Sequence, residues 1–376
     1  MKDIIAKPLV IYGMARKNDV VFFYNFTFGC IVEVNTKTSR TNIKWIDWSE
    51  RFIFADMYGG VKIDSDRLVF APRCADTLLV YNLSDGKVDY IPYKPTLLLE
   101  GRRVNQFVDV HVHEDYYYLF PGRNDEIVKV NKNTHVVSYI EGWAEELGEM
   151  PNPNSVKFNS VTRIDEHICM LPCFQKGVVM EFDMETDRWV LHNVYDGELS
   201  DIVYDGEYYW ISVREKKRLL RWKPLDGSEM VEEFVIESEN EESRGFIHII
   251  AGNNCMLLIP FFGKYIYRFN KESAEVTQIE VWNDTDCCEK LKEVNPANVN
   301  TFSCLRVSPE ENYIYDALHG RLLEINADKI SIKRIELKLP EEEYAMLNKA
   351  FLRARLLSPC VENEELGLTE LIEVIE

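Results

Sequence analysis

Short apolar or alternating runs, separated by Gly, Asn, Asp and Pro, follow one another along most of this chain. The segment from 246 to 282 shows the pattern well, because it contains the runs Phe246–Gly252, Cys255–Phe262, Tyr265–Asn270 and Val276–Trp282. Runs of this length with turn residues between them are typical of strands in antiparallel meanders rather than of helices. The pattern therefore predicts a sheet structure built from consecutive hairpins.

One run recurs seven times with the same character, an apolar centre that ends in Asn, Asp or Lys. The copies are GCIVEVN (Gly29–Asn35), DTLLVYN (Asp76–Asn82), DEIVKVN (Asp125–Asn131), GVVMEFD (Gly177–Asp183), KRLLRWK (Lys217–Lys223), KYIYRFN (Lys264–Asn270) and GRLLEIN (Gly320–Asn326). Their starts lie 40 to 56 residues apart, a period typical of circular or stacked repeats. A final Asn or Asp suits a turn, since its short side chain bonds the backbone that follows.

Each copy is the third of four strand-like runs, and seven units of four strands predict a seven-bladed β-propeller. The chain resembles the β-propeller superfamily in architecture from about Pro8 to Leu339. It lacks the Gly-His and Trp-Asp dipeptides of tryptophan-aspartate repeats, and its single Gly59-Gly60 pair is not the regular double glycine of kelch repeats. A stacked solenoid is the alternative, but it would normally show tighter periods and polar caps.

The predicted fold class is all-β, with a propeller over residues 1–340 and a C-terminal tail over 341–376. The blades are expected near 8–48, 58–93, 105–143, 158–195, 200–236, 245–282 and 301–339. In the tail, Glu341–Leu357 is predicted to form a helix that begins after Pro340, and Leu371–Ile375 alternates like a strand.

Charge and cysteine content narrow the classes of partner and location. The formal net charge is −20, and an acidic surface repels phosphate backbones and anionic lipid, so neither nucleic acid nor membrane is expected as a partner. Nine cysteines at irregular spacing make no disulfide framework. No apolar stretch is long enough to span a bilayer and the first residues lack a signal-peptide core, so a cytoplasmic location is expected.

Four arginines fall on one rim of the predicted ring. Function in a propeller tends to lie on the loops of one face, where connections from the second to the third strand meet those between blades. Aligning the repeats puts Arg73, Arg123 and Arg214 in the connections from the second to the third strand, together with Gln175. Arg244 and Gln106 lie at the starts of inner strands. Arginine suits carboxylate and phosphate. We predict that these side chains bind an anion, although each arginine could instead pair with a carboxylate of the next loop.

A weaker candidate is a metal site at Asp109, His111 and His113. Period-two alternation puts these three side chains on one face of a strand, and two imidazoles with a carboxylate are ligands that zinc accepts. Packed, hydrogen-bonded histidines are the simpler interpretation. No dinucleotide, Walker, nucleophile-elbow or His-Glu-x-x-His motif is present, so no cofactor is expected.

Two function hypotheses follow. In the first, the chain is a non-enzymatic binding module that recognises an anionic small molecule or a protein segment on the loop-rich face. In the second, it is a lyase, epimerase or mutarotase acting on an acidic sugar. An arginine would then neutralise the carboxylate, and His319 or Tyr58 would act as acid or base. The absence of catalytic motifs favours the binding module.

Overall fold

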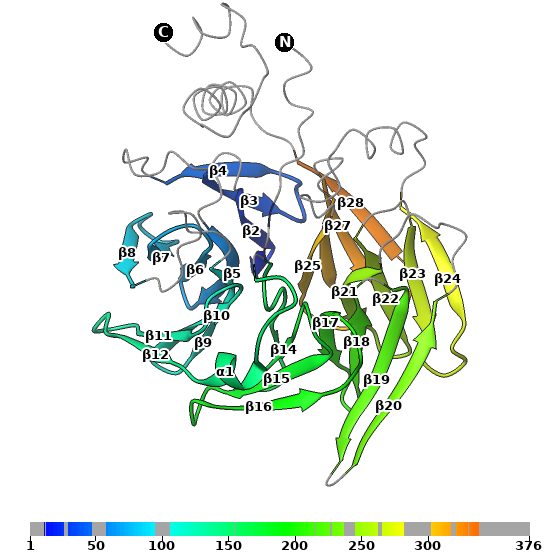
Figure 1. Cartoon of the computed structure of the whole chain (residues 1–376). Coiled ribbons are helices and arrows are strands. Elements are labelled where there is room, and N and C mark those ends of the chain that lie inside the picture. Colours follow the sequence, from blue (N-terminus) through cyan, green and yellow to red (C-terminus); the bar gives the residue numbers. More distant parts are fainter. Residues whose placement is uncertain are drawn as a thin grey trace, which may run out of the picture.

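A ring of seven antiparallel sheets forms the protein, as the computed structural model shows (Figure 1). The structure describes residues 11, 13–25, 29–46, 58–94, 106–153, 155–214, 216–225, 228–236, 245–261, 265–281, 302–316, 321–329 and 331–337. The seven-bladed all-β fold predicted from the repeats is confirmed. The predicted tail and its helix lie outside the described residues. No described helix is long and apolar enough to cross a membrane.

Each blade takes four strands in chain order. Blades 1 to 4 contain β1 (Met14–Lys17), β2 (Val20–Asn25), β3 (Cys30–Asn35) and β4 (Thr41–Trp45); β5 (Tyr58–Asp64), β6 (Arg67–Pro72), β7 (Thr77–Asn82) and β8 (Val88–Pro92); β9 (Phe107–His113), β10 (Tyr116–Pro121), β11 (Ile127–Asn131) and β12 (Val137–Ile140); and β13 (Thr162–Arg163), β14 (Ile168–Pro172), β15 (Val178–Asp183) and β16 (Arg188–Asn193). Blades 5 to 7 contain β17 (Leu199–Tyr204), β18 (Tyr209–Val213), β19 (Arg218–Leu225) and β20 (Ser228–Val235); β21 (Phe246–Ala251), β22 (Cys255–Pro260), β23 (Tyr265–Asn270) and β24 (Val276–Glu280); and β25 (Phe302–Arg306), β26 (Asn312–Asp316), β27 (Arg321–Asn326) and β28 (Ser331–Glu336).

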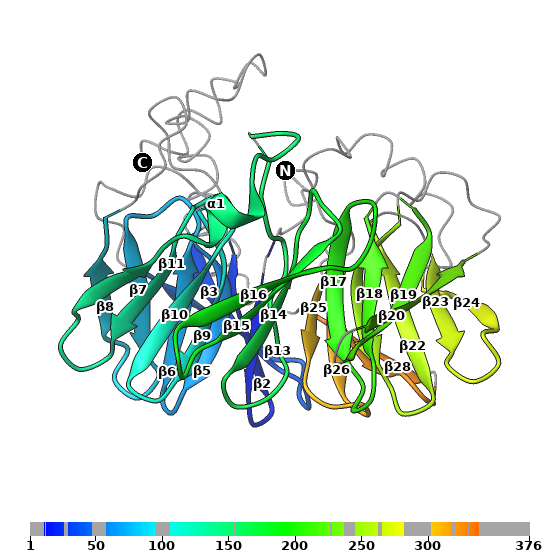
Figure 2. The ribbon, with the colours of Figure 1, turned by 60° about the horizontal axis from the view of Figure 1, so that its bottom comes forward.

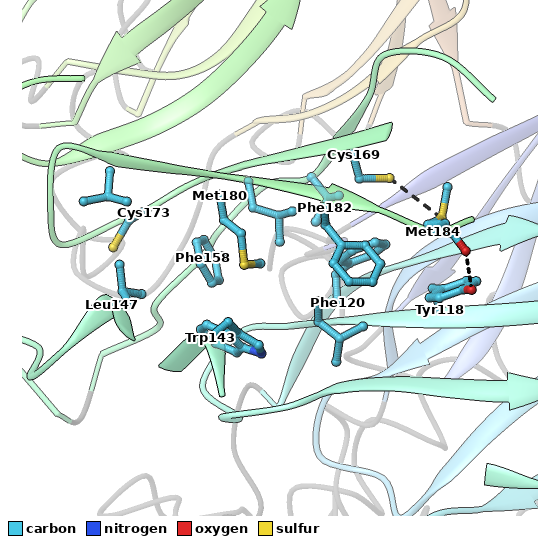
Figure 3. Packing of buried hydrophobic residues seen from close by; sticks show 14 residues of the cluster. Tyr118, Phe120, Trp143, Leu147, Phe158, Cys169, Cys173, Met180, Phe182 and Met184 are labelled. Atoms are coloured by element: carbon cyan, nitrogen blue, oxygen red, sulfur yellow. Dashed lines mark hydrogen bonds between the residues drawn. The ribbon is translucent and has the colours of Figure 1, made fainter. Parts of the chain in front are cut away.

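Buried side chains fill the space between adjacent blades. Between blades 3 and 4, Phe120 and Phe182 meet edge to face with their ring centroids 5.7 Å apart (Figure 3). The same cluster takes in Trp143 from α1 (Trp143–Leu147), the only helix among the described residues. Trp143 is fully buried, and burying an aromatic side chain of this size stabilises the fold by roughly 1.5–3 kcal/mol or more. The helix is thereby fixed on one face of the ring (Figure 2).

The seam between blades 7 and 1 is closed by side chains. No described strand is shared between these two sheets. Phe23 of blade 1 instead packs against Tyr315 of blade 7, with ring centroids 5.4 Å apart. An ion pair of 2.6 Å joins Arg16 to Glu311 across the same seam. Ser303 also donates to the carbonyl of Ile11 at 2.5 Å, and Lys333 to the carbonyl of Thr36 at 3.0 Å. Closure among the described residues therefore rests on packing, one ion pair and side-chain hydrogen bonds.

The turn after the third strand is the same in most blades. The side chain of Asn35 accepts hydrogen bonds from the backbone of Lys37 and Thr38, and the equivalent Asn or Asp does the same for one or two N–H groups two to three residues on in five further blades. Four residues after the Asn or Asp, the chain turns through positive φ, at Ser39, Gly86, His135, Asp187 and Ala274. The turn role predicted for the last residue of the repeat is confirmed.

Replacing Ala274 with glycine is expected to stabilise the protein. Ala274 has φ of 58°, a left-handed conformation that costs a residue with Cβ about 1–2 kcal/mol, of which the greater chain entropy of glycine offsets a part. The expected gain is about 0.5–1 kcal/mol in the free energy of unfolding, measured by urea denaturation. The same change at Ala251, inside β21, should destabilise. Equal effects at the two positions would contradict this account of the turn.

Candidate functional site

The loop-rich face carries α1 and the described residues that follow it, 148–153 and 155–158, which rise together above the ring (Figure 2). Gln175 fixes this segment from below. Its Oε1 accepts a hydrogen bond from the backbone N of Asn152 at 2.8 Å, and its Nε2 donates to the carbonyl of Val156 at 3.0 Å. Gln175 is buried. The side chain of Gln175 therefore holds the residues after α1 in place on this face.

Gln106 brings two of the predicted arginines to one place. Its backbone N donates to the carbonyl of Arg73 at 2.9 Å, and its own carbonyl accepts the backbone N–H of Arg123 at 3.3 Å. The buried side chain of Gln106 bonds the hydroxyl of Tyr93 and the carbonyl of Ala75. The backbone of Gln106 therefore couples the second-to-third loops of blades 2 and 3.

Arg123 carries a charge that no carboxylate of the described residues compensates. Its guanidinium forms no hydrogen bond or ion pair with any residue that the structure describes, and its Nε is buried without a partner there. Burial lowers the pKa of Arg123, and the neighbouring charge of Arg73 lowers it further. The loops that carry Arg73 and Arg123 thus meet at the junction of blades 2 and 3, and the charge of one arginine acts on the other.

Arg123 lines an open pocket of about 860 Å³ between α1, the 148–155 segment and blade 3, which we call the Arg123 pocket. The other residues that line it are Asp125, Ala144, Glu145, Gly148, Glu149, Met150, Pro153, Ser155 and Lys157. Lys157 is already engaged, because its Nζ lies 2.6 Å from Asp125 and donates to the carbonyl of Arg123 at 2.5 Å. Glu145 and Glu149 are exposed. The pocket therefore presents one arginine opposite a wall of carboxylates.

The other predicted residues of this face do not join the Arg123 pocket. Arg214 forms an ion pair of 3.0 Å with Glu198 and lies over the ring of Phe174 at 4.0 Å. Tyr58 is buried, and its hydroxyl lies 3.0 Å from Oγ1 of Thr77. Burial raises the pKa of Tyr58, so the phenol retains its proton. Arg244 and His319 lie outside the described residues.

Asp109 and His111 meet in the central channel, whereas His113 points to another partner. His111 Nε2 lies 3.3 Å from Asp109 Oδ2, but His113 Nδ1 lies 3.0 Å from the carbonyl of Glu166. Within the described residues, the His, Cys, Asp and Glu side chains close enough to share an ion are instead His167, Asp183 and Glu185. That group includes the carboxylate that holds the blade 4 turn.

A second constellation lines the channel. Arg306 of blade 7 reaches three other blades: it donates to Thr162 Oγ1 of blade 4 at 3.1 Å, to the carboxylate of Asp201 in blade 5, and to the carbonyl of Ile249 in blade 6 at 2.7 Å. Burial lowers the pKa of Arg306 to about 10. Sequence reasoning missed Arg306, because only the ring brings residues this far apart into contact.

Lys62 lies in the channel on the side of blades 2 and 3. Its Nζ lies 2.6 Å from Asp109 Oδ2. The strands β5 and β9 approach so closely here that a Cβ on Gly60 would lie 2.3 Å from Asp109 Oδ1, so this position requires glycine. The polar residues that the seven inner strands and their turns place in the channel could have been found by aligning those strands for charged positions.

Comparison with known proteins identifies the fold. No protein-family model and no curated protein matches the chain. Similar solved structures include a catalytically inactive virginiamycin B lyase from Staphylococcus aureus with quinupristin (TM-score 0.59, 10% identity, covering 85% of this chain and 95% of that one). YCF48 bound to D1 peptide has a TM-score of 0.59 and 14% identity, covering 86% of this chain and 95% of that one. Hsv2 from Kluyveromyces lactis has a TM-score of 0.55 and 9% identity, covering 88% of this chain and 100% of that one. At these identities the likeness extends to the propeller fold alone.

Proposed function

We propose that the chain is a non-enzymatic binding module that takes a carboxylate-bearing protein segment in the Arg123 pocket. The observation that carries the proposal is the guanidinium of Arg123, which lies beside Arg73 and has no carboxylate partner within the described part of the chain. A carboxylate that enters the pocket meets the guanidinium of Arg123 in a partly desolvated place, with the charge of Arg73 behind it. Its attraction to Arg123 is stronger than at an open surface.

The charges around the pocket favour a protein segment over a small anion. Glu145 and Glu149 stand on the opposite wall, and they would repel a free polyanion. A peptide can place one carboxylate at Arg123 and a neutral or basic residue near these glutamates, so its charge pattern matches the pocket. A bound peptide could pack against α1 and the residues that follow it, because both rise beside the pocket.

The enzyme hypothesis has less support from the site. Propellers host both kinds of activity, since virginiamycin B lyase and peptide-bound YCF48 share this architecture, and the fold alone does not choose between them. As an acid or base, Tyr58 would have to leave its hydrogen bond to Thr77 and give up a proton that burial holds. Its phenol is only 2% exposed, so a substrate in the Arg123 pocket would not reach it.

Replacing Arg123 with glutamine is expected to weaken peptide binding by roughly 10- to 100-fold, because a charge-assisted hydrogen bond contributes about 1.5–3 kcal/mol. Random peptides displayed against the full chain supply the ligand, and the affinity of one selected synthetic peptide is measured by calorimetry. A version of that peptide with its acidic residue changed to the amide should lose a similar factor.

Arg188→Gln is the matched control, since Arg188 is exposed on the outer strand of blade 4, and this variant should bind like the parent. Selection of peptides without acidic residues, or equal binding by Arg123→Gln, would overturn the proposal. Binding of free small anions that is lost in Arg123→Gln would favour the small-molecule ligand instead.

A further inference from the structure

The central channel contains a cavity of about 740 Å³ that is separate from the Arg123 pocket. It extends from Gly13 and Gly60 at one end of the inner strands to Asn253 and Ser308 in the turns at the other end. Every blade contributes a polar or charged side chain to it. A cavity of this size holds a small molecule.

The charges in the channel leave an excess of one positive charge. Arg16 is neutralised by Glu311 at 2.6 Å and Asp205 by Lys271 at 2.9 Å. The remaining charged groups that line the cavity are the cations Lys62, Arg163 and Arg306 and the carboxylates Asp109 and Asp201. Arg163 is exposed and lowers the pKa of the exposed Asp165 carboxylate near it, so the excess lies at the rim of the channel.

Arg163 supplies the uncompensated charge. Its guanidinium donates to the carbonyls of Asp165 at 2.7 Å, Val112 at 2.9 Å and Glu166. Carbonyl groups satisfy its hydrogen-bonding capacity but do not cancel its charge. The field of Arg163 reaches His111, whose pKa is lowered mainly by burial and also by Lys62 and Arg163, against the opposing effect of Asp109.

His111 supplies the unsatisfied polar atom. The residue is 5% exposed, and its Nε2 has no hydrogen-bond partner among the described residues. Asp109 lies near, but its Oδ2 is engaged by Lys62 at 2.6 Å and its Oδ1 by the backbone N of Val110 at 2.9 Å. A buried polar atom left unsatisfied destabilises a protein, and such atoms in native structures commonly bond a bound molecule.

We propose that the channel cavity binds a small molecule through an oxyanion group, a carboxylate or a phosphate, held by His111 Nε2 with Lys62 and Arg163 beside it. The oxyanion accepts the hydrogen bond that Nε2 lacks and neutralises the excess positive charge. The cavity reaches the first-to-second strand turns at Asn253 and Ser308, on the face opposite the Arg123 pocket. This site is independent of the peptide site proposed above.

Calorimetric titration of the full chain with acetate and with inorganic phosphate, at constant ionic strength, tests the proposal. We expect saturable binding of at least one of the two anions. The anion that binds more tightly shows whether the site prefers a carboxylate or a phosphate. His111→Phe should weaken that binding at least tenfold. This variant retains an aromatic ring against Phe120, which His111 contacts edge to face at 5.5 Å, and leaves the Lys62–Asp109 pair intact. His192→Phe, on the outer strand of blade 4, is the matched control and should bind like the parent.

A second measurement does not depend on the stability of any variant. In ¹⁵N spectra of the histidine rings, the His111 signal is the one missing from His111→Phe, and in the parent protein it should shift along a saturable curve as the anion is added. If neither anion binds, or if binding leaves the His111 signal unmoved, or if His111→Phe binds as tightly as the parent, the channel is not an oxyanion site.

Discussion

Replacing Arg306 with methionine is expected to lower the free energy of unfolding by about 3–5 kcal/mol, because it leaves a buried carboxylate without its cation. The carboxylate is that of Asp201, which is fully buried. Methionine keeps an unbranched apolar stem, so the packing of the arginine methylene groups is largely retained when the charge is lost. The measurement is urea denaturation of the parent and the variant at neutral pH.

An exposed arginine–carboxylate pair supplies the comparison. Arg218 pairs with Glu233 across blade 5, where both side chains are about one third exposed, and such pairs contribute about 0–1 kcal/mol. Arg218→Met should therefore change stability far less. Asp201→Asn combined with Arg306→Met should recover much of the loss, since no buried charge then remains unpaired. A loss at Arg306 no greater than at Arg218 would show that the channel network contributes little to stability.

The second large effect is a fall in stability below neutral pH. Burial lowers the pKa of His248 to about 4, against about 6.5 in an unfolded chain. Asp201 Oδ2 lies 3.6 Å from its Nδ1, but that carboxylate is already held by Arg306 and by the backbone N of Ile249. Burial therefore governs the direction of the shift.

Between pH 6.5 and pH 4 the unfolded chain binds a proton that folded His248 does not. The free energy of unfolding is therefore at its full value above pH 6.5 and falls by roughly 3 kcal/mol as the pH drops to about 4. Burial lowers the pKa of His111 also, which adds to the fall. Denaturation at a series of pH values measures it.

His248→Gln should flatten the pH dependence in this window, whereas His135→Gln, at an exposed turn, should leave it unchanged. Carboxylates with lowered pKa values, such as Asp183 and Asp205, lose their contribution at lower pH, as they become protonated below about pH 4. A parent protein with constant stability from pH 7 to about 4 would contradict the assignment of His248 as a buried neutral imidazole.

The sequence predicted the ring because each repeat carries its own strand and turn signals. An apolar third strand that ends in Asn or Asp is a local feature, and the turn at Asn35 follows from that residue alone. Local signals do not show where a strand is interrupted. In blade 4 the inner segment pairs with the second strand at Phe158 through a bridge to Cys173 and again at Thr162–Arg163, and the repeat, which predicts a start near 158, does not show the gap between them.

The candidate sites were predictable only where two residues occupy equivalent positions in neighbouring repeats. Arg73 and Arg123 meet for this reason, through Gln106. The pairing of Arg214 with Glu198 depends on the path of one connection, which the repeat does not specify. The contact of Arg306 with Asp201 joins residues 105 positions apart and crosses the ring, so it follows from ring closure and not from any pattern along the chain.

The seam between blades 7 and 1 has a mechanical consequence. A ring in which one strand is shared between its first and last sheets can open there only by breaking a ladder of backbone hydrogen bonds. Here the described strands are not shared, so the contacts to be broken are made by side chains, such as Phe23 with Tyr315, Arg16 with Glu311 and Lys333 with the carbonyl of Thr36, and both sheets stay intact. Under a pulling force the molecule would therefore uncoil as a string of folded blades before any single blade unravels.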